Sequence, residues 1–187
     1  MRIFFEYIGT GYTHVIPFGL DHILFILSLY FFSTSFKDVL INCSVFTVAH
    51  SLSMAFTIIG FIVPNPDFIE PLITFSILYV SIENIVSDKI NRFRFLVIFL
   101  FGIIHGFGFA NALKEIGLPK SDFIITLFSF NFGVELGQIS IIILAYILIV
   151  YWFKDKSWYK NRVIYPISSI IGCIALIMTI NRVMDIL

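Results

Sequence analysis

Charged side chains are scarce in this sequence. Of its 187 residues only 13% are Asp, Glu, Lys or Arg, whereas 59% are hydrophobic, and the mean hydropathy is +0.99. A soluble domain carries about 25% charged residues. A soluble globule of this size could not bury so much apolar surface, so the composition excludes that class. The net charge is zero and no block of Lys or Arg occurs, so we expect no nucleic-acid partner.

Cysteine is also rare, with two residues in the chain. Cys43 and Cys173 lie in separate apolar segments and form no CxxC motif, and neither is adjacent in sequence to a histidine. This pattern is typical of small apolar packing residues rather than of thiolate metal ligands.

Long apolar runs dominate the remainder of the chain. A helix needs about 20 residues to cross the hydrocarbon core of a bilayer. Six runs approach or exceed this length, near residues 16–35, 39–63, 70–88, 94–113, 122–153 and 163–183. The fifth is longer than a bilayer requires, so we expect it to tilt or to project past the membrane. Residues 2–13 are too short to span, and Pro17 and Gly19 are expected to bend the chain after them.

The predicted fold is therefore all-α: a polytopic membrane helix bundle of six transmembrane helices that forms one transmembrane domain over residues 1–187. A short interfacial or half-buried helix precedes the first span. Eight of the twelve Lys and Arg residues fall beside the loops that follow the first, third and fifth spans. The positive-inside rule puts those loops in the cytoplasm and both termini on the outer side.

Ionisable side chains occur inside five of these predicted spans, at middle to outer depth except for one slightly cytoplasmic carboxylate. They are Asp21, His22, His50, Glu83, His105 and Glu135. Ionisable groups at such depth are costly and usually functional. Their similar depth predicts one shared site. His14, just before the first span, is either an interfacial residue or a further ligand.

Neutral polar residues accompany the ionisable ones. On the fifth span Asn131, Glu135 and Gln138 repeat at i, i+4 and i+7 and therefore share one helix face. Gly133 and Gly137 are interleaved with them, and small residues let another helix approach closely. Several groups have a structural alternative, in which they only satisfy hydrogen bonds or charges between helices: Asp21 with His22, His50 with Ser51, His105, and Asn131 with Glu135 and Gln138. Glu83 with Asn84 could likewise cap its helix or pair with Lys89 or Arg92.

Imidazole and carboxylate groups together suit zinc, nickel, cobalt, iron or copper(II). Asp21 and Glu135 are expected either to bind the ion or to orient a histidine ring. A proton relay of His, Asp and Glu is the alternative without a metal.

Several polar segments resemble the HupE/UreJ family of hydrogenase and urease accessory membrane proteins. They are residues 14–25, 46–51, 80–84, 101–110 and 130–138. The resemblance covers about residues 7–150. It implies a multi-pass protein of the bacterial inner membrane that passes nickel or a related divalent metal towards metalloenzyme maturation partners.

The chain resembles the broader branch of that family rather than its hydrogenase-linked members. Six residues rather than five separate His14 from the Asp21-His22 pair. Phe101 and Gly108 stand where those members carry a histidine and a glutamate. Glu83 and Glu135 are the residues that could replace the missing ligands.

The leading hypothesis is a divalent-metal permease. His14 and the Asp21-His22 pair would receive the ion from the outer side, and Glu83 would pass it towards the cytoplasm. The residues that would hold it at mid-membrane are His22, His50, His105 and Glu135. Weak sequential binding lets an ion leave each site.

The main alternative is an intramembrane zinc-dependent hydrolase or acyl transferase that acts on a lipid or lipid-linked substrate. Ser51 or Glu83 would then transfer protons. A third hypothesis is a metal sensor or accessory protein. Nickel and zinc are the metals that we expect in each case.

Overall fold

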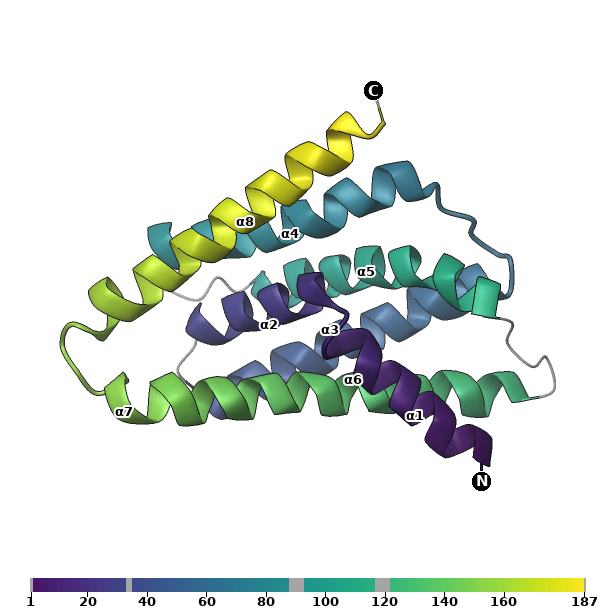
Figure 1. The fold of residues 1–187 in the computed structure, drawn as a ribbon, viewed down its shortest axis with the longest axis horizontal. Coiled ribbons are helices and arrows are strands. Elements are labelled where there is room, and N and C mark those ends of the chain that lie inside the picture. The colour runs from purple at the N-terminus through teal and green to yellow at the C-terminus, as the bar shows by residue number, and fades with distance from the viewer. Residues whose placement is uncertain (1, 33–34, 88–92, 117–121, 187) are drawn as a thin grey trace.

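The computed structural model describes residues 2–32, 35–87, 93–116 and 122–186, without the side chains of residues 32 and 110–116. These ranges are helical and contain no strand, which confirms the all-α prediction. The helices are α1 (Arg2–Val15), α2 (Leu20–Phe32), α3 (Phe36–Ile58), α4 (Pro66–Val86), α5 (Arg94–Ile116), α6 (Phe123–Ala145), α7 (Tyr151–Phe153) and α8 (Tyr165–Met184). Two π-helical segments, η2 (Tyr146–Val150) and η3 (Lys160–Ile164), follow α6 and precede α8 (Figure 1).

Within the described ranges, four helical stretches are long and apolar enough to cross a membrane by themselves: α3, α4, Phe123–Phe153 and Lys160–Met184. A fifth span is formed if α1 and α2, which meet at a bend of 71°, are counted together. Helix α5 has 23 residues, and its described side chains form an apolar stretch over Arg94–Phe109. Each of the six predicted spans thus contains a helix, but the first, 16–35, contains only the 13 residues of α2 and reaches spanning length only with α1.

The bend between α1 and α2 lies where proline and glycine predicted it. Pro17 cannot donate a backbone hydrogen bond, and it disfavours helical geometry at Ile16. The Ile16–Pro17 peptide bond is cis. Helix α2 then begins at Leu20, so the break brings the last turn of α1 next to the first turn of α2.

Helix α1 is half-buried because it packs against α6, as the glycines of the fifth predicted span indicated. A Cβ atom at Gly133 would overlap the carbonyl oxygen of Ile8, and one at Gly11 would overlap that of Phe130. Both helices therefore need glycine at their crossing. This contact fixes the end of α1 that carries His14.

Helices α3 and α5 are in similarly close contact. A Cβ atom at Gly106 would overlap the Ser53 hydroxyl and the carbonyl oxygen of His50. A Cβ atom at Gly102 would lie 2.6 Å from the carbonyl oxygen of Phe46. The small face around His105 therefore brings α5 against the part of α3 that carries His50.

Helix α4 begins four residues before the predicted start at residue 70. The side chain of Asn65 accepts a hydrogen bond from the backbone N–H of Asp67 at 3.0 Å, and Pro66 occupies the first turn. An Asn N-cap followed by proline is a strong start signal for a helix. Pro71 consequently lies inside the helix rather than in its first turn.

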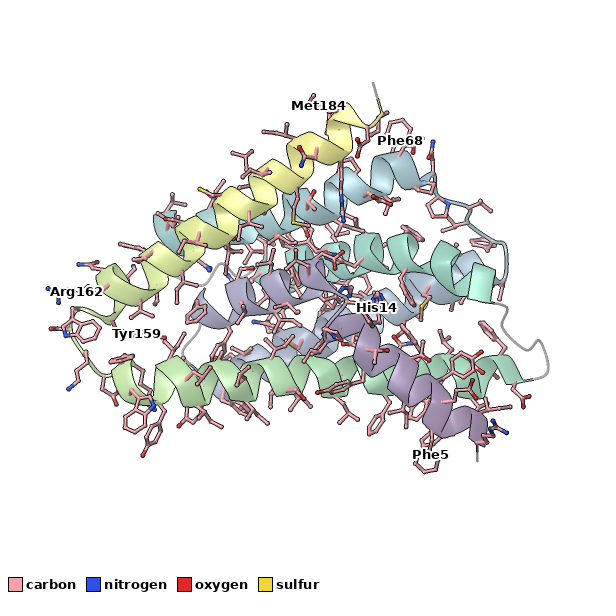
Figure 2. The ribbon with its side chains drawn as sticks, in the orientation of Figure 1. Phe5, His14, Phe68, Tyr159, Arg162 and Met184 are labelled. Carbon is pink, nitrogen blue, oxygen red and sulfur yellow. The ribbon has the colours of Figure 1, made fainter. Side chains whose placement is uncertain are left out.

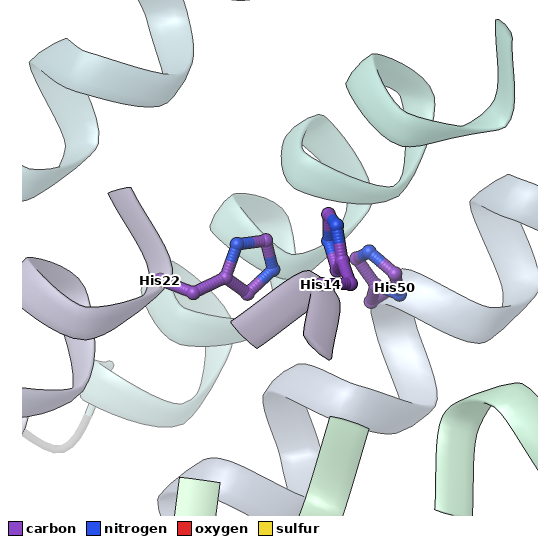
Figure 3. A group of neighbouring side chains, drawn as sticks. All are labelled: His14, His22 and His50. Atoms are coloured by element: carbon purple, nitrogen blue, oxygen red, sulfur yellow. The ribbon is translucent and has the colours of Figure 1, made fainter. Parts of the chain in front are cut away.

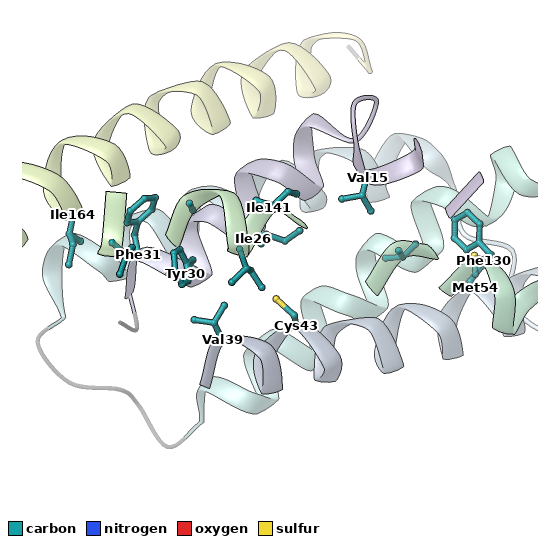
Figure 4. Close-up of a cluster of buried hydrophobic side chains, with 14 of the residues drawn as sticks. Val15, Ile26, Tyr30, Phe31, Val39, Cys43, Met54, Phe130, Ile141 and Ile164 are labelled. Atoms are coloured by element: carbon teal, nitrogen blue, oxygen red, sulfur yellow. The ribbon is translucent and has the colours of Figure 1, made fainter. Parts of the chain in front are cut away.

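The larger apolar core is built from α1, α2, α3, α6 and the helical segments that follow α6 (Figure 4). Among its fully buried side chains are Val15, Ile26, Tyr30 and Phe130. Cys43 lies in this core with a free thiol, and Cys173 is free and exposed. Cys43 is therefore an apolar packing residue, as predicted.

The helix ends that the predicted topology puts on the same side of the membrane lie at the same end of the bundle. The N-terminal end of α1 and the C-terminal end of α8 point towards the end of the bundle that holds the α3–α4 loop (Figure 1). Arg162 and Tyr159 mark the opposite end, where α6 and α8 are joined (Figure 2).

The continuous helix Phe123–Phe153 has 31 residues, about 46 Å at 1.5 Å per residue. It therefore exceeds the thickness of the hydrocarbon core, as expected for the fifth span.

Candidate metal centre

The four histidines come from four different helices and meet inside the bundle. His14 is in the last turn of α1, His22 in the first turn of α2, and His50 and His105 lie within α3 and α5. His22, His50 and His105 are 2%, 0% and 1% exposed. His14 is partly buried. The bend after α1 and the glycine contacts of α1 and α5 together produce this convergence.

Three of the rings are close enough to share an ion (Figure 3). One ring nitrogen from each of His14, His22 and His50 lies within 4.8 Å of the other two. Nitrogens bound to one tetrahedral metal lie about 3.3 Å apart, because each metal–nitrogen bond is about 2.0 Å. Small inward movements would close the site. The ring of His105 is next to it, with its centroid 5.4 Å from that of His22.

Each fully buried histidine directs Nδ1 towards an oxygen atom. The pairs are His22 with Asp21 Oδ1 at 3.3 Å, His50 with Asn131 Oδ1 at 3.5 Å, and His105 with the Phe101 carbonyl at 2.8 Å. These oxygens accept, so Nδ1 is the donor in each neutral ring, and the lone pair is then on Nε2. Such contacts fix both the tautomer and the orientation of a metal-binding imidazole.

The Nε2 atoms are the unsatisfied groups of the site. Within the described ranges, Nε2 of all four histidines is buried and has no hydrogen-bond partner. A buried polar atom without a partner carries a desolvation cost, so it requires a physical explanation. A metal bound by these nitrogens would supply one. The donor set therefore fits a divalent transition metal.

A small cavity of about 130 Å³ reaches the histidines from the end of the bundle that holds the α3–α4 loop. It is lined by His14, Asp21, His22, His105, Glu70, Ile73, Gly108, Phe109 and Arg182. A Cβ atom at Gly108 would lie 2.6 Å from Cδ1 of Ile73, so a larger residue at this position would require the Ile73 side chain to move.

Glu70 and Arg182 were not expected at this site. Arg182 lies at the last turn of α8 and Glu70 in the first turns of α4. Both positions fall at the ends of apolar runs that the predicted topology puts on the outer side. The signal in the sequence that could have identified them was an acidic and a basic residue at two helix ends on the same predicted side.

Aromatic rings occupy the other side of the histidine cluster. The centroid of His105 lies 5.0 Å from that of Phe46 and 5.2 Å from that of Phe25. Phe25 follows His22 by one helical turn or less, and Phe46 precedes His50 by about one turn. Both rings therefore lie towards the α2–α3 end, where they form a buried apolar layer.

The polar stripe on α6 faces α3, but the structure does not bring its carboxylate into the group of three histidines. The Ser44 hydroxyl donates to Oε1 of Glu135 at 2.9 Å. The Thr47 hydroxyl donates to Oε1 of Gln138 at 3.3 Å. Ser44 precedes His50 by six residues, about 9 Å along the helix axis. Glu135 thus lies beyond the cluster towards the α2–α3 end.

The remaining predicted polar residues have partners of their own. Oε2 of Glu83 lies 2.8 Å from Nη1 of Arg94, and the Ser51 hydroxyl donates to the Thr47 carbonyl. The Asn84 amide donates to the Ser28 carbonyl at 2.8 Å. Lys89 and Arg92, the alternative partners for Glu83, lie outside the described residues.

Comparison with known proteins agrees with this description. A family model described as HupE / UreJ protein matches residues 1–182. Proteins of this family are generally nickel or cobalt transport or accessory proteins. No curated protein and no solved structure matches the chain significantly. The spanning helices and the family both identify a multi-pass membrane protein. Because the match extends over nearly the whole sequence, the chain belongs to the HupE/UreJ family.

Proposed function

We propose that this protein moves a divalent transition metal across the bacterial inner membrane. Nickel, cobalt and zinc all suit the imidazole donors. The observation that carries the proposal is the meeting of four histidines from four helices, each with a buried Nε2 atom that has no hydrogen-bond partner among the described residues. Ring nitrogens of three of them, His14, His22 and His50, lie within 4.8 Å of one another. In a membrane interior such groups are expensive unless they bind something. The family association with nickel and cobalt supports the same class of cargo.

The metal reaches the site through the cavity on the outer side. Asp21 is a wall of that cavity and contacts His22, so it offsets the charge of the arriving ion. His14, His22 and His50 then hold the metal, and His105 is near enough to exchange with one of them. Several neighbouring sites of modest strength let an ion advance and leave.

The route onward follows the contact between α3 and α6. Asn131 approaches His50, and the next polar contacts along these helices are Thr47 with Gln138 and Ser44 with Glu135. These polar contacts lie between α3 and α6, whereas the buried ring of Phe46 contacts His22 and His105 on α2 and α5. With the predicted topology, the cavity opens to the outer side, and the buried rings of Phe25 and Phe46 lie on the other side of the histidines.

The size of the cavity favours transport over the enzyme alternative. A pocket for an organic substrate has a volume of about 300–1,000 Å³, whereas this cavity has about 130 Å³. The space suits an ion and a few waters. Both candidate proton-transfer groups have partners outside the cavity: the Ser51 hydroxyl donates to the Thr47 carbonyl of its own helix, and Glu83 forms an ion pair with Arg94.

Flux into vesicles tests the proposal. The purified protein is reconstituted in vesicles that contain a metal-sensitive dye, and Ni²⁺, Co²⁺ or Zn²⁺ is added outside. We expect dye response in wild type and its loss in His22→Ala, His50→Ala and His105→Ala. Cys173→Ala, which removes an exposed soft ligand far from the site in sequence, should retain flux. Stoichiometric metal binding without flux, or equal flux in all variants, would contradict the proposal.

A further inference from the structure

An ion pair joins α4 and α8 at the cavity wall. Nε of Arg182 lies 3.7 Å from Oε2 of Glu70. Nη1 of Arg182 also donates to the backbone carbonyl of Glu70 at 2.8 Å. The guanidinium is therefore held at two points, one on the side chain and one on the backbone of the same residue.

The pair belongs to the same cavity as the histidines. Glu70 and Arg182 line it together with His14, Asp21 and His22. Among the described residues that line the cavity, Arg182 is the only Lys or Arg, and Asp21 and Glu70 are the only carboxylates. A cation that moves to the histidines through this cavity passes a carboxylate that already holds a positive side chain.

The two contacts of Arg182 differ in how easily they break. The side chains of Arg182 and Glu70 are 24% and 56% exposed, and ion pairs of this exposure contribute little to stability. The hydrogen bond to the Glu70 backbone does not depend on the carboxylate. The carboxylate can thus leave Arg182 and bind another cation while the guanidinium stays at the cavity wall.

We propose that Glu70 is the capture ligand of the metal path and that Arg182 is its resident counter-ion, displaced by the incoming metal. A divalent ion brings two positive charges to the Glu70 carboxylate in place of the single charge of Arg182. A monovalent ion brings no more charge than Arg182 and is therefore not favoured by the exchange. The pair would therefore favour divalent cargo before any histidine is reached. This inference rests on the proposed function, since it assigns the first step on that path.

Stopped-flow binding of Ni²⁺ alone to the full-length protein in detergent tests the assignment. Glu70→Gln should slow association about tenfold, because a carboxylate at the mouth of a path raises the local cation concentration. Arg182→Gln should speed association, because the competitor is removed, and Arg182→Lys should behave like wild type. The double variant should be as slow as Glu70→Gln. The number of ions bound should be unchanged in every variant.

Asp67→Asn is the matched control, since Asp67 is an acidic residue one turn earlier on α4 and does not line the cavity. It should leave the rate unchanged. If wild type binds Ni²⁺ but Glu70→Gln and Arg182→Gln associate at the rate of the control, the capture role is wrong and the histidine site stands. If wild type binds no metal, the proposed function fails, and the inference fails with it.

Discussion

The Asp21 carboxylate holds His22 at two points: Oδ1 accepts the backbone N–H at 2.9 Å and lies 3.3 Å from ring Nδ1. The ring is thereby turned so that Nε2 is buried and available to a metal. A carboxylate in this position fixes the tautomer and raises the basicity of a metal-binding histidine.

Asp21→Asn should weaken metal binding without abolishing it. Loss of such a partner reduces metal affinity about 10–100-fold. Titration calorimetry with Ni²⁺ measures the effect, and the stoichiometry should stay that of wild type. Asp38→Asn, at an exposed carboxylate in the first turn of α3, is the control. Equal affinity in Asp21→Asn and the control would mean that Asp21 does not act on the site.

Metal should stabilise the folded protein. A ligand that binds only the native state at 100 times its dissociation constant adds about 2.7 kcal/mol. We expect Ni²⁺ to raise the melting temperature of wild type and a chelator to reverse the rise. His50→Ala should show no rise, whereas Cys173→Ala should show the full one. A rise of the same size in His50→Ala would place the bound metal elsewhere.

Two glycines of α1 offer a direct test of helix packing. An added Cβ at Gly11 meets the Phe130 carbonyl of α6, whereas one at Gly9 meets no atom within 4 Å. Gly11→Ala should therefore destabilise the protein by about 1–3 kcal/mol, the usual cost of overpacking. It should also weaken metal binding, because α1 carries His14. Gly9→Ala should do neither; thermal unfolding in detergent that does not distinguish the two variants would contradict the α1–α6 contact.

The ion pair between Glu83 and Arg94 should support the fold rather than the metal site. Both side chains are largely buried, at 13% and 4% exposed. Removal of one partner from a buried pair costs about 3–5 kcal/mol. Glu83→Gln should therefore unfold more readily while it binds the same number of Ni²⁺ ions. Wild-type stability combined with a lower transport rate would instead make Glu83 part of the metal path.

The sequence predicted those features that depend on one helix at a time. Apolar length located the spans, Pro17 and Gly19 located the first bend, and Gly133 marked a face that another helix contacts. The start of α4 was placed too late because the Asn65 cap and Pro66 lie outside the most apolar part of the run.

Features that depend on helix rotation could not be predicted. A single polar residue per span, such as His50 or His105, does not tell which way its helix faces. The histidines converge because α3 and α5 pack closely at Gly106. This contact depends on both helices together and cannot be read from either one alone. Glu70 and Arg182 were overlooked for a related reason: each resembles an ordinary charged helix end, and only the contact between α4 and α8 brings them to the cavity.

X-ray absorption spectroscopy of the purified protein loaded with one equivalent of Ni²⁺ tests the central claim most directly. The account predicts a first shell that contains three or more nitrogen donors with the outer-shell scattering of imidazole, and a loss of imidazole scattering in His22→Ala. A shell of oxygen donors without imidazole, or no retained metal, would contradict it.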